Sequence, residues 1–360
     1  MNTAEIILFS FSLLFILGSF GSLLRWHGWW IRFFDFPRMQ ISTILLVLFA
    51  TSFVVYNFSE WWHFAIVILI IAGIILQAIK IFRYTPLHKK QVHSYKGGVD
   101  PENTISLIIS NVLQTNKEVH KLINHVKNHK PDILLTLESN NWWEEQLNKL
   151  ETDYPYSLKK PLENLYGMHL YSKLELIGPK IMYRVKKDIP SFEMKVKLNK
   201  EDILQLYCLH PKPPFPTESK TSLYRDAELL LVGKIVENED VPTIIAGDFN
   251  DVAWSYTTTL FQRVSGLLDP RIGRGFFNTF HAKYPFMRFP LDHIFHSPHF
   301  KLIKLKRLSE IGSDHFPIFA KLHLDHSHRH EQNKPDANKE EQEWASETID
   351  DTDPKRKTLN

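Results

Sequence analysis

The stretch that determines the fold is Pro242-Thr-Ile-Ile-Ala-Gly-Asp-Phe-Asn250, in which an apolar run ends on Asp248 and Asn250. Short apolar runs bounded by turn residues are typical of buried strands. Polar residues directly after a strand lie where a rigid scaffold meets solvent, which is where active sites are built. Taken singly, however, an Asp or Asn in such a place is more often a turn former or a helix cap.

The same arrangement recurs through residues 104–324. Further strands are predicted at 105–112, 132–137, 203–209, 291–296, 302–308 and 318–324. Helical spacing predicts helices at Glu118–His129, Asn141–Leu150 and Leu223–Glu237, the last with Ala227, Leu231 and Ile235 on its apolar face. The polar residues at the strand ends are Asn111, Glu138, His210, Asp248, Asn250, Asp292, Asp314 and His315. Four carboxylates, two histidines and two asparagines in this position are hard to attribute to turns alone.

Around these residues the chain reads Ser110-Asn111, Leu137-Glu138, Leu209-His210-Pro211, Gly247-Asp-Phe-Asn250, Leu291-Asp292-His293 and Gly312-Ser-Asp-His-Phe-Pro317. This order resembles the endonuclease/exonuclease/phosphatase superfamily, which includes deoxyribonuclease I, abasic-site endonucleases, neutral sphingomyelinases and inositol-polyphosphate 5-phosphatases. The segment Trp29–Gln40 resembles a bacterial membrane-anchored branch of it. The resemblance implies an α/β fold, a four-layer sandwich of two mainly antiparallel sheets flanked by helices.

The resemblance also implies a metal site. Glu138 matches the family's principal metal ligand, with Asn111 beside it, and Asp314 matches a second metal-contacting acid. Hard oxygen ligands suit Mg²⁺, which usually takes only one or two protein carboxylates and keeps several waters. The expected cofactor is therefore Mg²⁺, with Mn²⁺ as an alternative.

The remaining matched residues imply phosphoester hydrolysis, which needs an aligned water, neutralised phosphate oxygens and a stabilised leaving group. Asp248 would orient or deprotonate the water, and Asn250 would hold the phosphate. His315 would contact the phosphate or exchange a proton, with Asp292 fixing its tautomer. His210 would donate to a phosphate oxygen or the leaving group. Abasic-site endonucleases usually carry Tyr where this chain has His210, which argues against DNA repair.

The first 83 residues contain three uncharged apolar stretches, each close to the roughly 20 residues that span a bilayer. These stretches are residues 6–24, 40–58 and 62–79. A signal peptide would need a basic start, and Met1–Glu5 has no Lys or Arg. The absence of charged residues inside the stretches also argues against an ion or proton path, as in a transporter. The sequence therefore predicts about three transmembrane helices that anchor the chain in a lipid bilayer.

Basic residues predict the orientation. Arg25, Arg32 and Arg38 fall in the first connection, and Lys80 and Arg83 open the segment after the third stretch. Lys and Arg accumulate on the cytoplasmic side of membrane proteins. We therefore expect an integral membrane protein, in a bacterial inner membrane, with its main domain in the cytoplasm.

The predicted organisation is a transmembrane region at 1–83, a polar linker at 84–103, the hydrolase domain at 104–324 and a disordered tail at 325–360. The tail carries His326, His328 and His330, which we interpret as solvated residues rather than a metal site. The single cysteine, Cys208, excludes an intramolecular disulfide framework and is expected in the core.

Two functional interpretations follow. The favoured one is a membrane-anchored, metal-dependent hydrolase of phosphodiester or phosphomonoester bonds, acting on a nucleic acid, a phospholipid or a small molecule. The alternative is a catalytically inactive, membrane-anchored binding or scaffold protein. A net charge of +3 is too small to argue for nucleic acid by itself, and no protein partner can be inferred.

Overall fold

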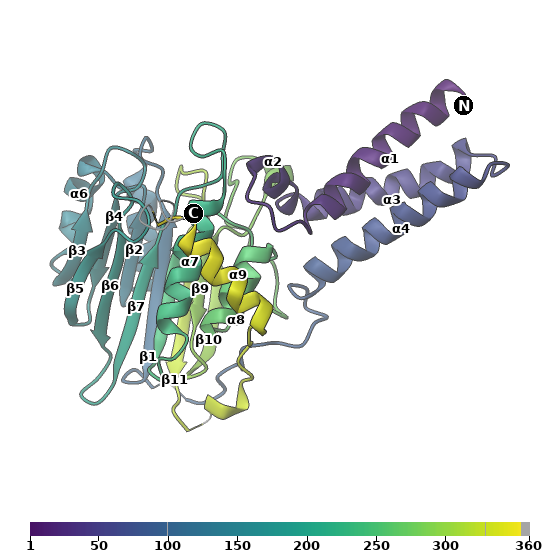
Figure 1. The fold of residues 1–360 in the computed structure, drawn as a ribbon. Coiled ribbons are helices and arrows are strands. Elements are labelled where there is room, and N and C mark those ends of the chain that lie inside the picture. The colour runs from purple at the N-terminus through teal and green to yellow at the C-terminus, as the bar shows by residue number, and fades with distance from the viewer. Residues whose placement is uncertain (99, 328, 354–360) are drawn as a thin grey trace.

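The computed structural model of the chain describes residues 1–98, 100–327 and 329–353. Three long helices project from one side of a layered domain, with the N-terminus at their far end (Figure 1). They are α1 (Thr3–Gly21), α3 (Arg38–Val55) and α4 (Trp61–Phe82), and each is long and apolar enough to cross a membrane. In each helix, no more than a third of an apolar stretch of 18 residues is buried inside the protein. Helices that are apolar on all sides need an apolar environment around them.

The predicted four-layer sandwich is confirmed. One sheet has the strand order β10-β11-β1-β2-β4-β3 and the other β5-β6-β7-β8-β9, with parallel pairing in β1/β2 and β7/β8 and antiparallel pairing elsewhere. The first sheet contains β1 (Thr104–Asn111), β2 (Ile133–Leu137), β3 (Tyr156–Lys160), β4 (Met168–Ser172), β10 (Phe300–Arg307) and β11 (Ile318–Leu324). The second contains β5 (Leu176–Met182), β6 (Ser191–Lys197), β7 (Ile203–Leu209), β8 (Thr243–Asp248) and β9 (Asp292–His296).

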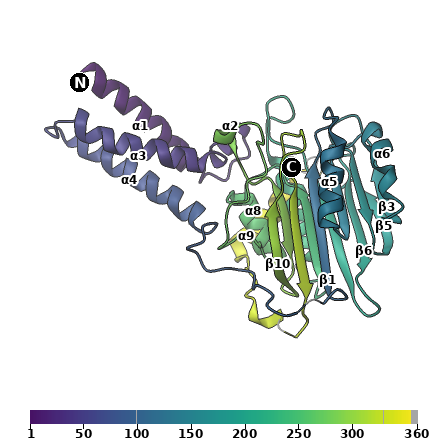
Figure 2. The same ribbon diagram turned by 180° about the vertical axis from the view of Figure 1, so that it is seen from behind.

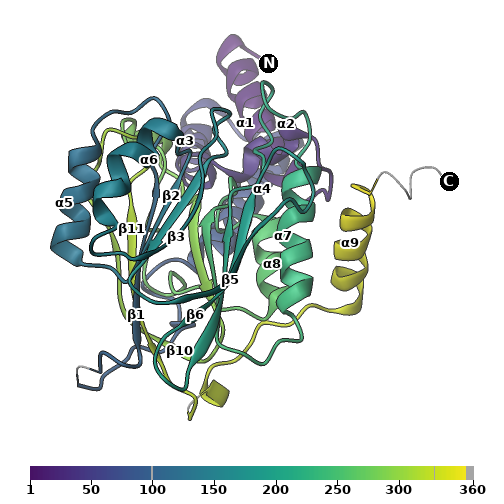
Figure 3. The same ribbon diagram turned by 90° about the vertical axis from the view of Figure 1, so that its left-hand side faces the viewer.

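Helices cover both outer faces (Figure 3). The first sheet carries α5 (Val119–His129), α6 (Asn141–Leu147) and the short η2 (Asn148–Leu150); the second carries α7 (Leu223–Val236) and α8 (Tyr256–Ser265). The alternation of side chains along each strand builds the layers. In β7, for example, Leu206 and Cys208 face the core between the sheets, whereas Tyr207 and Leu209 pack towards α7 and α8. Cys208 is therefore a core residue, as predicted.

The prediction of a disordered tail is wrong for the described residues beyond 324. They include η4 (Arg329–Glu331) and α9 (Lys339–Asp350), whose first turn is closed by a capping box between Asn338 and Glu341. Ala345 of α9 is fully buried in a small cluster with Leu230 of α7 and Leu260 of α8. A few apolar residues on one face of α9 are enough to pack it against α7 and α8. The polar average composition of the segment after residue 324 does not reveal so small an apolar face. His328 and residues 354–360 lie outside the described residues.

The segment 84–103, predicted as a linker, runs along the domain and is packed against it. Tyr84 and Val92 are buried, and the Tyr84 hydroxyl donates to the carbonyl of Ala253 at 2.6 Å. The backbone of this segment pairs with β10, where Tyr95 N donates to the Leu302 carbonyl at 2.9 Å. The segment is thus part of the folded domain and not a free connection.

The buried face of helix α7 only partly coincides with the predicted one, of which Ala227 is fully buried. Leu229, Val232 and Val236 pack towards the sheet, whereas Leu231 and Ile235 are only half-buried. Because α9 covers the opposite side of α7, apolar residues lie on two faces, and the spacing alone does not distinguish them.

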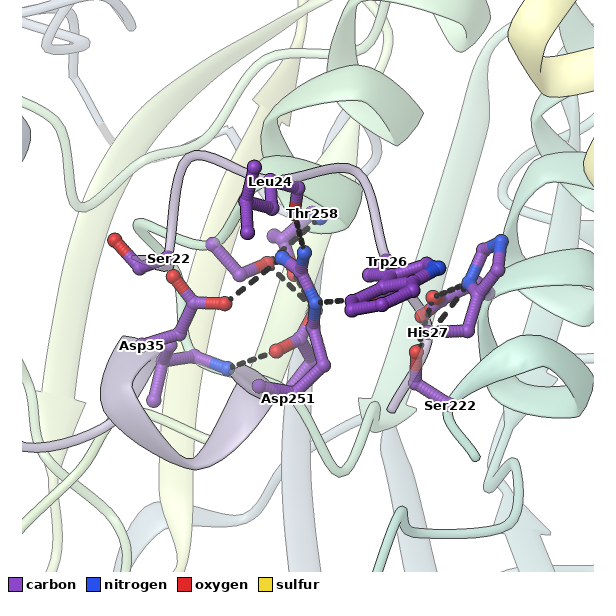
Figure 4. Close-up of polar contacts among 12 residues, drawn as sticks. Ser22, Leu24, Trp26, His27, Asp35, Ser222, Asp251 and Thr258 are labelled. Atoms are coloured by element: carbon purple, nitrogen blue, oxygen red, sulfur yellow. Dashed lines mark hydrogen bonds and ion pairs between the residues drawn. The ribbon is translucent and has the colours of Figure 1, made fainter. Parts of the chain in front are cut away.

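The connection between α1 and α3 is docked on the layered domain (Figure 4). It contains α2 (Trp29–Arg32) and η1 (Phe33–Asp35). His27 Nδ1 lies 3.0 Å from Asp226 Oδ2, and the His27 carbonyl accepts from Ser222 N at 2.7 Å. Trp254 Nε1 donates to the Asp35 carbonyl at 2.7 Å. These contacts fix the domain against its own ends of the three helices.

A buried polar network holds the same ends of the three helices together. Asp35 pairs with Arg32 at 3.1 Å and with Arg38 at 2.5 Å. Arg38 also donates to Gln77 of α4 at 2.9 Å, and Gln77 donates to Ser19 of α1 at 2.9 Å. Removing one partner of a buried, hydrogen-bonded charge pair leaves an uncompensated charge, so this network strongly favours one arrangement of helices and domain.

Glu228 of α7 predicts a pH-dependent stability. It is 2% exposed, and its Oε1 has no hydrogen-bond partner among the described residues. Burial raises the pKa of Glu228 from 4.5 to about 8, although Arg184 opposes the shift. The folded state therefore binds the proton more tightly than the unfolded state. The contribution of Glu228 to stability is fully present below about pH 4.5 and is lost as the pH rises to about 8. The free energy of unfolding falls by up to about 1.4 kcal/mol per pH unit in this range.

In Glu228→Gln this loss should vanish, so the variant's melting temperature should fall less than that of the wild type between pH 6 and 9. The exposed Glu201→Gln serves as control, and parallel melting curves for Glu228→Gln and wild type would contradict the assignment.

Candidate active site

The eight predicted site residues lie at one end of the two sheets. Parallel pairing brings the end of β1, Asn111, beside Leu137, which Glu138 follows. In the second sheet Leu209, which precedes His210, pairs with Gly247. Asp248 of β8 is directly opposite Asp292 of β9.

Asn111 connects the two sheets across the core. Its Nδ2 donates to Glu138 Oε1 at 2.8 Å and to Asp248 Oδ2 at 3.1 Å. Its Oδ1 accepts from Leu113 N at 3.1 Å, which fixes the side-chain amide. A residue predicted on weak sequence grounds thus joins the acid after β2 to the acid at the end of β8.

His315 lies between two carboxylates. Its Nδ1 is 2.7 Å from Asp292 Oδ2, and its Nε2 is 3.6 Å from Asp248 Oδ2. Burial alone would lower the pKa of His315, but Asp292 and Asp248 outweigh it and raise the pKa to about 10. At neutral pH the ring is therefore an imidazolium that carries a proton on both nitrogens.

Glu138 is partly buried, and two other carboxylates lie near it. Burial raises its pKa to about 7, and Asp314 and Asp248 add to the shift, against the opposing effects of Asn111 and His315. Its backbone is in the left-handed region, with a φ of 57°. Such a conformation is uncommon outside glycine and is found preferentially at functional sites. The opposing effects of His315 and Asn111 are thus too weak to restore the ordinary pKa of this carboxylate.

The loop after β8 is held rigidly. Asn250, with a φ of 51°, donates its backbone N–H to Asp248 Oδ1 at 2.8 Å and its Nδ2 to the Pro211 carbonyl at 2.9 Å. Buried Arg225 donates to the Asn250 carbonyl at 2.9 Å. At Gly247 an added Cβ would lie 1.9 Å from the Leu209 carbonyl oxygen, so this position requires glycine.

His210 differs from His315 in charge. It is 2% exposed, and its Nδ1 is without a hydrogen-bond partner in the described part of the chain. Burial lowers the pKa of His210 to about 4. Its ring packs against Tyr166 with the centroids 5.4 Å apart. At neutral pH His210 is a neutral imidazole, able to donate one hydrogen bond.

The last motif is tied to β1 by Ser313, a residue of the motif to which the sequence analysis gave no role. Ser313 Oγ donates to the Asn111 carbonyl at 2.8 Å and accepts from His315 N at 3.0 Å. Asp314, between them, is partly exposed. Arg225 and Thr279, whose Oγ1 accepts from Asp292 N at 3.1 Å, were also missed. Neither lies at the end of a predicted strand, so no sequence signal pointed to them.

Among the described residues, one group of His and acidic side chains could hold a metal ion. Ligand atoms of Asp248, Asp292 and His315 lie within 4.8 Å of one another. A histidine must be neutral to bind a metal, whereas Asp292 and Asp248 favour the protonated form of His315.

The sequence matches the model of the endonuclease/exonuclease/phosphatase family over residues 108–315, which is more than half of the chain and includes all eight site residues. The chain belongs to this family. No curated protein matches it.

Solved structures confirm the fold. D. rerio TDP2 in complex with a single-strand DNA product is 17% identical with a TM-score of 0.51, and the match covers 61% of this chain and 99% of that one. The human Nocturnin catalytic domain with bound sulfate is 17% identical with a TM-score of 0.50, covering 63% and 96%. An endonuclease/exonuclease/phosphatase from Beutenbergia cavernae is 14% identical with a TM-score of 0.50, covering 62% and 72%. Family membership indicates phosphoesterase chemistry and a divalent metal.

Proposed function

We propose that this family member is an active, membrane-anchored, metal-dependent phosphoester hydrolase. The observation that carries the proposal is the Asn111-bridged pair of carboxylates beside the buried imidazolium of His315. Four acids, Glu138 among them, lie around the cationic ring of His315, and the raised pKa of Glu138 shows that its charged form is disfavoured there unless a cation is bound. A scaffold without activity would have no need to bury this charge, because burying unpaired carboxylates destabilises the fold.

Glu138, Asn111 and Asp314 would hold the metal. Oxygen ligands from two carboxylates and one amide fit Mg²⁺ or Mn²⁺. The raised pKa of Glu138 supports this position, since a nearby cation would restore the carboxylate to its charged form. When bound, the metal would neutralise charge on the phosphate oxygens.

The charges of the other residues suggest how they share the work. Asp248 accepts hydrogen bonds from Asn111 and Asn250 and would orient and deprotonate the attacking water. His315, held by Asp292, would contact a phosphate oxygen as a cation, because a group with a pKa of about 10 gives up its proton slowly near neutral pH. Neutral His210 and the second N–H of the Asn250 amide would donate hydrogen bonds to the phosphate or the leaving oxygen.

The three apolar helices would anchor the enzyme in a bilayer. The first connection with its three arginines and the start of the segment after α4 lie at the same, domain-side end of the helices (Figures 1 and 2). Because basic residues remain on the cytoplasmic side, we place the catalytic domain in the cytoplasm and the N-terminus on the opposite side, in a bacterial inner membrane.

Hydrolysis by the full-length protein in lipid nanodiscs tests this function. The substrates are plasmid DNA, RNA, phospholipids and a chromogenic phosphodiester, each with Mg²⁺ or with EDTA. We expect Mg²⁺-dependent turnover of at least one substrate that His315→Ala abolishes and the exposed His120→Ala does not. A folded protein that hydrolyses none of them and binds no Mg²⁺ would favour the scaffold alternative.

A further inference from the structure

A loop beside the active site carries an exposed apolar tip. Backbone pairing between Phe280 and Phe289 closes the loop, and its tip is the short helix η3 (Pro285–Met287). Tyr284, Phe286 and Met287 are 58%, 86% and 52% exposed. Three large, exposed apolar side chains within four residues are a group of the kind that marks interaction sites on protein surfaces. We call residues 281–288 the lip.

The base of the lip touches the catalytic residues. Ala282 N donates to the Asp314 carbonyl at 2.6 Å, and the rings of Phe280 and His315 have their centroids 5.0 Å apart. Phe286 is the fourth residue after Ala282. Because a chain extends by at most about 3.6 Å per residue, the backbone at the tip lies within about 14 Å of this contact.

The tip of the lip touches the membrane anchor. Gln40 Nε2, in the first turn of α3, donates to the Phe286 carbonyl at 2.6 Å. The base is also held, since Phe289 packs against Phe36 with the ring centroids 5.7 Å apart. Since α3 is a candidate span that begins at Arg38, this contact places the tip at the level where the helix enters the membrane.

The anchor continues the apolar surface of the lip. Trp30, Phe33 and Met39, which flank the start of α3, are 54%, 56% and 39% exposed. Aromatic side chains favour the boundary between headgroups and hydrocarbon. The lip and this part of the anchor therefore present apolar side chains at the start of the same candidate span, and the buried Asp35 network keeps the domain in that orientation.

We propose that the lip inserts into the leaflet at the domain-side ends of the helices, and that the active site takes the phosphoester headgroup of a lipid from that leaflet. The substrate class rests on the proposed function; the insertion of the lip does not. The headgroup layer is about 5–8 Å thick, so a lipid phosphate needs to rise only a short way to reach a site within about 14 Å of the tip. A soluble nucleic acid would gain nothing from an apolar lip at the bilayer.

Insertion can be measured without activity. Cys208 is the only cysteine and is 1% exposed, so Phe286→Cys can be labelled selectively with a fluorophore. The control is Ile203→Cys, 45% exposed at the start of β7, seven residues before His210 and so about 20 Å from the site. In proteoliposomes with spin-labelled lipids we expect quenching of the label at 286 to be at least about 3-fold stronger than at 203, and weaker quenching by aqueous iodide. Equal quenching at the two positions, or ready access of iodide to the label at 286, would overturn the insertion. Weak quenching by the spin-labelled lipids is also the result expected if a protein partner covered the lip in place of lipid.

The substrate class is tested with Phe286→Ser in nanodiscs that contain mixed phospholipids. We expect the ratio of lipid turnover to turnover of a soluble chromogenic phosphodiester to fall at least about 10-fold, whereas Ile203→Ser leaves the ratio unchanged. An unchanged ratio in Phe286→Ser, or a wild type that hydrolyses the soluble ester but no lipid, would overturn the lipid substrate while the proposed function stands. A wild type that hydrolyses neither the lipids nor the soluble ester would contradict the proposed function itself. The quenching experiment would still show whether the lip inserts into the bilayer.

Discussion

Replacing Asp248 with Asn lowers kcat for phosphoester hydrolysis by at least about 1000-fold, within the range expected for loss of a general base together with its charge. The carboxylate is buried, accepts from Asn111 at 3.1 Å and lies 3.6 Å from His315. Burial raises the pKa of Asp248, although His315 opposes the shift, which makes this carboxylate a better base than one in water. An asparagine retains the oxygen that accepts from Asn250 N but has no proton-accepting carboxylate.

The control for this variant is Asp240→Asn. Asp240 is 65% exposed and lies just before β8, at the opposite end of the strand that Asp248 completes. It should keep kcat within about 2-fold of wild type, as surface substitutions usually do. A kcat in Asp248→Asn within 10-fold of wild type, with an unchanged melting temperature, would show that Asp248 is not the base.

Glu138→Gln should weaken Mg²⁺ binding by about 100-fold, which corresponds to about 2.7 kcal/mol. The change removes one negative charge from a site where the attraction between a carboxylate and a divalent cation is strengthened by burial. The amide still fits the space and can still accept from Asn111 Nδ2. Activity at saturating Mg²⁺ should recover in part, which separates loss of the metal from loss of the fold. Calorimetric titration of Mg²⁺ into the full-length protein measures the affinity directly.

Glu145→Gln, an exposed acid on α6 close to Glu138 in sequence, should bind Mg²⁺ as the wild type does. If Glu138→Gln also binds Mg²⁺ with wild-type affinity, the metal lies elsewhere, and the group formed by Asp248, Asp292 and His315 becomes the better candidate.

The strands around the site could be predicted because their sequences are short, apolar and followed by polar residues. β1, β2, β7, β8, β9 and β11 all fall within about two residues of the predicted ranges. No such signal exists for β3 or β5. β3 is Tyr-Ser-Leu-Lys-Lys and partly exposed, and β5 contains Gly178 and Pro179, which usually argue against a strand interior. Both are edge strands, where these residues are tolerated.

The position of the site residues could be predicted, but their charges could not. From sequence, His210 and His315 are two histidines with equal claims to acid–base chemistry. In the structure one is a buried neutral ring beside Tyr166, and the other lies between two carboxylates. This difference comes from the pairing of β8 with β9 and from the return of the chain before β11, and neither can be derived from local spacing.

The docking of the anchor on the domain was also beyond the sequence. His27 and Asp226 are far apart in the chain, and each reads as an ordinary surface residue. Their contact, and the donation from Trp254 to Asp35, depend on how the chain turns between α1 and α3. These contacts show why activity should be tested on the full chain: a fragment of 104–324 would lose the anchor, the packed segment 84–103 and α9.

The most direct test of the central claim is the rate of phosphodiester hydrolysis by purified full-length protein as Mg²⁺ is removed and restored, with Asp248→Asn measured in parallel. We expect turnover that stops in EDTA, returns on addition of Mg²⁺ and is absent from the variant under both conditions. Hydrolysis that persists in EDTA, or that Asp248→Asn retains, would contradict a metal-dependent hydrolase built on this site.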